Sequence, residues 1–113
     1  MQIQINTDNN VNGREKLAAY VRGIVENAVG RFSQHITRVE VHLGDEHGDK
    51  PGPDDKRCMM EVRVESRNPI AVTHHATTLN LAVDGAAGKL RRSIEHDLHR
   101  LRAHRHEAQK MRA

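Results

Sequence analysis

The spacing of the apolar residues changes several times along the chain, and this change constrains the fold more than any other feature. Two long segments, about 13–31 and 78–107, repeat apolar residues at intervals of three and four, as amphipathic helices do. Four shorter segments alternate apolar and polar residues, as half-buried strands do: 2–6, 37–43, 57–65 and 70–76. The predicted order is β-α-β-β-β-α, and a right-handed crossover at its start makes the first two strands parallel.

Each predicted strand has one apolar face and one polar face. In the second strand, Val39, Val41 and Leu43 alternate with polar or charged side chains. A sheet of this kind is covered by helices on one side only. The predicted fold class is therefore α+β, a four-stranded mixed sheet with two helices packed on one face. A chain of 113 residues makes one compact domain, which we expect over 1–107, followed by a frayed C-terminal tail over 108–113.

Both predicted helices carry signals at their ends. Asn12 and Glu15 have the spacing of an N-cap and its reciprocal partner at the first helix. Thr77 or Thr78 caps the second helix, whose small residues at 85–88 let it lie close to the sheet. At 1.5 Å per residue the second helix is about 45 Å long. Because this exceeds the width of a small sheet, its end should project.

Composition excludes several classes of protein. Aromatic residues make up only 2% of the chain, so the core must be aliphatic, and recognition of single strands by base stacking is disfavoured. No apolar run approaches the roughly 20 residues of a membrane span, and the first residues lack the apolar stretch of a signal peptide. The single cysteine, Cys58, occupies an inward strand position and cannot form an internal disulfide. We therefore expect a reduced, cytoplasmic protein without a membrane partner.

Charge is distributed unevenly along the chain. The formal net charge is +3, yet from Lys89 to the end eight basic residues face three acidic ones. The rest of the chain therefore carries a net charge of −2. This asymmetry indicates a polyanionic partner for the C-terminal segment. The alternative is an ordinary solvated helix face.

Five side chains of the second helix project on one flank of its apolar stripe, and we call them the basic ridge: Lys89, Arg92, His96, His99 and Arg100. Three further basic residues lie on the other flank: Arg91, Arg102 and Arg105. A basic surface beside a packed face suits the phosphates of folded RNA, which is recognised by shape more than by sequence. The alternative is that long surface helices carry such side chains anyway, with their stems covering apolar surface.

The remaining residues that could bind a metal or take part in catalysis form no complete site. Zinc takes three or four ligands, whereas His96 and His99 supply two at helical spacing, and no Cys-x-x-Cys or His-Glu-x-x-His accompanies them. The acidic segment 44–55 lacks the ordered spacing of a calcium loop, and we interpret it as a solvated hairpin loop. No nucleophile elbow, phosphate-cradling loop or dinucleotide fingerprint occurs. We therefore expect no enzyme activity, cofactor, metal or small-molecule substrate.

Four segments together resemble one known family: MQIQI at 1–5, VGRF at 29–32, HITRVEVHL at 35–43 and AVDGAAGKLRR at 82–92. They resemble the ribosome hibernation-promoting factor and ribosome-associated translation inhibitor family over residues 1 to about 102. The last segment is similar to the family pattern Ala-Ile-Asp-x-x-x-Asp-Lys-Leu-x-Arg, which four residues match directly: Asp84, Lys89, Leu90 and Arg92. The chain departs from the family at Gly88, which replaces an acid, at residues 78–80, which lack an acidic cap and an aromatic, and in its longer acidic loop.

This resemblance implies a function and a set of binding residues. Members of the family resemble double-stranded-RNA-binding domains in shape and bind the small ribosomal subunit in the channel for mRNA and the A- and P-site tRNAs. There they inhibit translation and preserve idle ribosomes during stress or stationary phase. The resemblance implies that Lys89 and Arg92 face ribosomal RNA, that the rest of the basic ridge adds to this surface, and that three more residues extend it: Arg22, Arg31 and Arg38.

The resemblance also concerns the form of the protein. The chain looks like a short member of the family, without the additional C-terminal domain of long members. The alternative hypothesis is a divergent, stress-related module that binds a protein or a metal and does not bind the ribosome.

Overall fold

A computed structural model of the chain describes residues 1–8, 14–45, 55–65 and 67–112, with side chains described up to His99. The elements are β1 (Gln2–Thr7), α1 (Arg14–Val29), a 3-10 turn η1 (Gly30–Phe32), β2 (Ile36–Asp45), β3 (Lys56–Val64), β4 (Ile70–Ala76) and α2 (Leu79–Arg112). The order β-α-β-β-β-α predicted from the sequence is confirmed.

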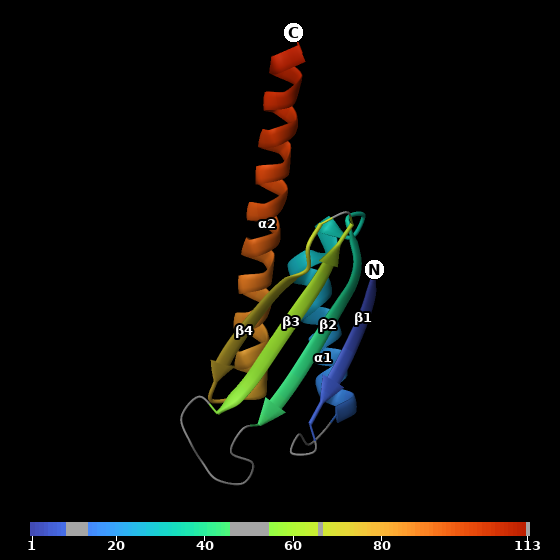
Figure 1. The fold of residues 1–113 in the computed structure, drawn as a ribbon. Coiled ribbons are helices and arrows are strands. Elements are labelled where there is room, and N and C mark those ends of the chain that lie inside the picture. The colour runs from blue at the N-terminus through green and yellow to red at the C-terminus, as the bar shows by residue number, and fades with distance from the viewer. Residues whose placement is uncertain (9–13, 46–54, 66, 113) are drawn as a thin grey trace.

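The four strands form one mixed sheet in the order β1-β2-β3-β4. β1 pairs with β2 in parallel, and the other two pairs are antiparallel. Figure 1 shows both helices on the same side of this sheet. The opposite side, which we call the open face, is not covered by any described helix or strand. The predicted α+β class and its one-sided covering are confirmed.

The core lies between the sheet and the two helices and is aliphatic. Its fully buried side chains come from both helices and the two central strands: Val21, Val25, Val29, Val39, Val41, Cys58, Met60, Val62, Val83, Leu90 and Ile94. Cys58 is completely buried, as its inward strand position predicts, and burial raises the pKa of its thiol to about 12. A thiol in this state does not react as a thiolate near neutral pH.

Strand β2 is longer than predicted at both ends. A register shift between Ile36 and Arg38 marks a β-bulge, which lets Ile36 enter the core three residues before Val39. Thr37, at the bulge, donates a hydrogen bond from its hydroxyl to the carbonyl oxygen of Arg63 at 3.2 Å. At the other end the prediction of a loop from residue 44 is wrong, because Gly44 and Asp45 pair with β3. Residues 46–54 of the predicted loop lie outside the described residues.

The helix boundaries follow local hydrogen bonds. α1 ends at Val29, two residues before its predicted end, and η1 continues the chain. The Asn12 cap lies outside the described residues. At α2 the backbone N–H of Leu81 donates to the hydroxyl of Thr78 at 3.1 Å, so Thr78 is the cap. α2 runs on to Arg112, past the expected end at 107, and projects well beyond the sheet (Figure 1).

One glycine sets the distance between α2 and β4. A Cβ added to Gly85 would lie 2.1 Å from the ring of His74, so no larger residue fits without moving that ring. Gly88 has no such neighbour, because its nearest atoms belong to the Arg92 side chain. The predicted close approach of the helix is therefore confirmed at Gly85 and not at Gly88.

Candidate nucleic-acid interface

The basic ridge lies on the outer side of α2. Ala86, Leu90 and Ile94 on the opposite side of the helix are buried. Arg92, His96 and His99 are exposed, whereas Lys89 is half-buried. The side chain of Arg100 lies outside the described ones. Three of the ridge side chains are therefore open to a partner.

Lys89 has a contact that the sequence does not indicate. Its ammonium donates a hydrogen bond to the carbonyl oxygen of Thr73 at 2.9 Å. Because β4 is an edge strand of the sheet, this bond satisfies a carbonyl group at the edge and fastens α2 beside it. An ammonium has three donors, so Lys89 can still add positive charge and further hydrogen bonds to the ridge.

Three acidic residues of α2 with described side chains pair with groups on other elements. Asp97 accepts two hydrogen bonds from Arg67, in the β3–β4 connection, at 3.1 and 2.7 Å. Glu95 forms an ion pair with Arg31, next to the end of α1. Asp84 accepts a hydrogen bond from the hydroxyl of Tyr20 in α1 at 2.6 Å.

These pairs have an electrostatic consequence. Hydrogen bonding to Asp97 raises the pKa of the Arg67 guanidinium, and hydrogen bonding to Asp84 raises the pKa of the Tyr20 hydroxyl. Within the described part of the chain, Arg91 and Arg92 form no ion pair. The charge of Arg92 on the outer side of α2 is therefore not offset by a described carboxylate.

A groove of about 410 Å³ lies where α2 passes the end of α1. Its lining residues come from η1, from the turn that follows it and from α2: Arg31, Phe32, His35, Glu95, Leu98 and His99. The guanidinium of Arg31 lies over the ring of Phe32, 4.8 Å from its centroid, in cation–π geometry. The groove thus brings together two residues predicted for the binding surface, Arg31 and His99.

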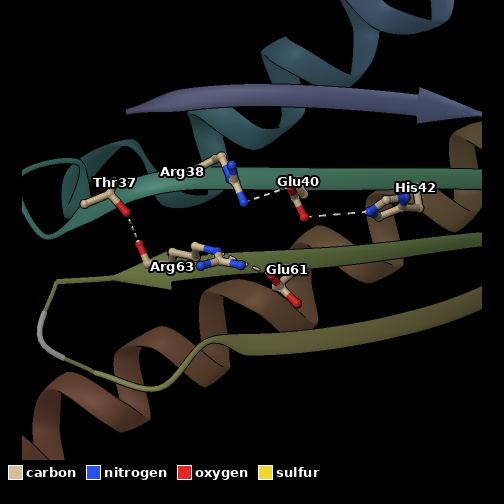
Figure 2. A network of polar contacts seen from close by, with 6 residues as sticks. All are labelled: Thr37, Arg38, Glu40, His42, Glu61 and Arg63. Atoms are coloured by element: carbon tan, nitrogen blue, oxygen red, sulfur yellow. Dashed lines mark hydrogen bonds and ion pairs between the residues drawn. The ribbon is translucent and has the colours of Figure 1, made fainter.

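Two other predicted residues lie apart from the ridge. Arg22 donates a hydrogen bond to the carbonyl oxygen of Ile3 at 3.3 Å, so it lies beside β1, away from the α2 side of α1. Arg38 lies on the open face of the sheet, where it pairs with Glu40 at 3.0 Å (Figure 2). The sheet therefore separates Arg38 from the ridge, and an RNA contact of Arg38 stays a prediction.

The sequence reasoning missed the groove and the ion pairs that join α2 to the rest of the fold. Phe32, the only phenylalanine of the chain, was the one available signal for the groove. Among the described residues, no group of three or more His, Cys, Asp or Glu side chains is placed to hold a metal ion. Within the same residues, no helix combines the length and the apolar character that crossing a membrane requires.

Comparison with known proteins identifies relatives of this fold. Residues 3–102 match the family model described as sigma 54 modulation protein / S30EA ribosomal protein. The Protein Y N-terminal domain of Thermus thermophilus has a similar structure, with a TM-score of 0.69 and 17% sequence identity over 85% of this chain and 98% of that one. A ribosomal subunit interface protein from Coxiella burnetii gives a TM-score of 0.64 and 15% identity over 85% and 96% of the two chains. A search of curated protein sequences finds no match.

Proposed function

We propose that this chain, which belongs to the sigma 54 modulation protein / S30EA ribosomal protein family, is a ribosome-associated hibernation factor. It binds the small ribosomal subunit in the channel used by mRNA and by the A- and P-site tRNAs, and its presence there inhibits translation. It acts in the cytoplasm during stress or stationary phase and does so by occupancy, without catalysing a reaction.

The observation that carries this proposal is the charge on the outer side of α2. Arg92 is exposed and has no ion pair among the described residues, and three acids of the same helix, Asp84, Glu95 and Asp97, pair with Tyr20, Arg31 and Arg67. A positive surface of this kind binds phosphates and releases their counterions. Ribosomal RNA presents such phosphates at high density.

The ridge residues have distinct roles in this proposal. Arg92 contacts phosphate directly, and Lys89 contacts phosphate while it remains bonded to the edge of the sheet. His96 and His99 extend the contact along the helix, followed by Arg100. Arg31, paired with Glu95 in the groove, lies at the margin of this surface.

The shape of α2 also supports the proposed binding to ribosomal RNA. α2 is a straight rod of 34 residues, about 51 Å long at 1.5 Å per residue, and it extends past the sheet (Figure 1). A rod with a basic side can follow an RNA groove or channel over several phosphates. The scarcity of aromatic side chains favours contact with the backbone over stacking on bases.

Co-sedimentation with purified ribosomes tests the proposal. The double variant Lys89→Glu/Arg92→Glu should bind at least about tenfold more weakly than the wild type at 0.1 M salt, because two phosphate contacts become repulsive. Arg92→Glu and Arg63→Glu form the charge-matched pair, since each reverses one exposed arginine, the first on the ridge and the second on the open face. Wild-type binding by the double variant would refute the assignment of the ridge. A wild-type protein that does not sediment with ribosomes would refute the function.

A further inference from the structure

The open face of the sheet carries its charges in bands that run across the strands. The β2–β3 register places Arg38 opposite Arg63 and Glu40 opposite Glu61. One row of the face is therefore positive, and the next row is negative. Figure 2 shows these four side chains on the two central strands, on the side away from the helices.

This register is unfavourable within one molecule. Like charges directly opposite each other on neighbouring strands repel, and opposite charges in those positions attract. The cost is offset along each strand, where Arg38 pairs with Glu40 at 3.0 Å and Arg63 approaches Glu61 at 3.7 Å. The side chains remain partly accessible, with exposures of 34% and 22% in the first pair and 53% and 28% in the second.

The bands also restrict what can bind to the open face. A nucleic acid would place phosphates against the row of Glu40 and Glu61, which repels them. A protein surface with a negative row and a positive row in the reverse order would match both bands. The same face of a second copy has this property, because a two-fold axis reverses the order of its rows.

We propose that the open face binds the open face of a second copy of this chain. The two-fold axis lies in the plane of the interface, perpendicular to the strands, and passes between the two bands. Each strand then lies over its own counterpart, as in aligned sheet packing. Arg38 faces the partner's Glu40, and Arg63 faces the partner's Glu61, so the interface contains four ion pairs.

The size of the face sets the strength of this contact. Four strands about 4.8 Å apart and about seven residues long, at about 3.3 Å per residue, give a face of roughly 400 to 450 Å². The two copies together bury roughly 800 to 900 Å², less than the roughly 1,200 Å² of a stable interface. The dimer is therefore weak and forms at high micromolar protein concentration. It should also weaken as salt is raised.

The test is sedimentation equilibrium of the full chain at low salt, from 10 to 500 µM. The wild type should show a concentration-dependent dimer. Arg63→Glu and Glu61→Arg should each weaken it by at least tenfold, because each variant places like charges in contact across the axis. An equimolar mixture of these two variants should recover dimers, since the new carboxylate at position 63 of one copy faces the new guanidinium at position 61 of the other.

The recovered dimer in the mixture also shows that both variants are folded. The proposal is overturned if the wild type remains monomeric at 500 µM, if the single variants associate as the wild type does, or if the mixture gains nothing over its components. It is also overturned if Arg63→Glu reduces ribosome co-sedimentation as much as Lys89→Glu/Arg92→Glu does, because the open face would then be an RNA contact. The inference does not rest on the proposed ribosome binding.

Discussion

On α2 the described carboxylates Asp84, Glu95 and Asp97 pair with groups on other elements, whereas on the open face each described glutamate pairs with an arginine of its own strand. Asp97 binds Arg67 and Glu95 binds Arg31, and neither arginine belongs to α2. On the open face, Glu40 neutralises Arg38 two residues before it. The location of the partner thus decides which surface shows a net charge. The arrangement on α2 favours binding of a polyanion. The arrangement on the open face favours binding of a surface that carries a positive row and a negative row in the reverse order.

The first prediction concerns how α2 is held against the sheet. Gly85→Ala should lower the free energy of unfolding by about 1 to 3 kcal/mol, because the new Cβ overlaps the half-buried His74 ring and that ring must move. Gly88→Ala, three residues later, is the matched control and should raise stability by up to about 1 kcal/mol through helix propensity. Urea unfolding measures both. Equal effects of the two substitutions would show that the close approach at Gly85 does not constrain the helix.

The second prediction compares a tertiary ion pair with a pair inside one strand. Asp97→Asn should lower the free energy of unfolding more than Glu61→Gln on the open face does, because it weakens a contact in which Arg67 donates two hydrogen bonds. Glu61→Gln on the open face should lower the free energy of unfolding by less than about 0.5 kcal/mol. The Arg63 side chain is mostly exposed, and its distance to Glu61 is long for an ion pair.

Asp97→Asn has a second expected consequence. It removes a negative charge from α2, so ribosome binding should become tighter, whereas Glu61→Gln should leave ribosome binding unchanged. Thermal unfolding and co-sedimentation on the same samples separate the two effects. If Glu61→Gln tightened ribosome binding as much, the distinction between the two surfaces would fail.

The third prediction concerns the two exposed histidines of the ridge. An imidazole N–H can donate a hydrogen bond to a phosphate oxygen. His96→Ala/His99→Ala should therefore weaken ribosome binding a few-fold in co-sedimentation, whereas His42→Ala, on the open face beside Glu40, should leave binding unchanged. Wild-type binding by the double variant would remove His96 and His99 from the interface.

Much of the fold could be predicted because its signals are local. The alternation of Val39, Val41 and Leu43 indicates which side of β2 is buried, and helical spacing identifies the ridge. The bulge at Thr37 could not be predicted, because alternation does not reveal an extra residue in one strand. The register between β2 and β3 was equally hidden, since it depends on residues brought together from distant parts of the chain.

The candidate site was predictable only in part for the same reason. Helical projection places Lys89 and Arg92 on one flank, yet it does not show that Lys89 bonds to Thr73. It also gives no information about Arg38 relative to the ridge, because they lie on different layers. The pairing of Glu95 with Arg31, 64 residues away, is a tertiary contact that no local pattern encodes.

The salt dependence of ribosome binding tests the central claim, that net charge on the outer side of α2 binds ribosomal RNA. Affinity is measured between about 50 and 200 mM salt for the wild type, Arg92→Glu and Arg63→Glu. Each phosphate contact contributes about 0.7 to 0.9 to the slope of log affinity against log salt. The account predicts a steep slope for the wild type and for Arg63→Glu, and a slope smaller by about one contact for Arg92→Glu. A slope for Arg92→Glu equal to that of the wild type, or an equal loss in Arg63→Glu, would contradict it.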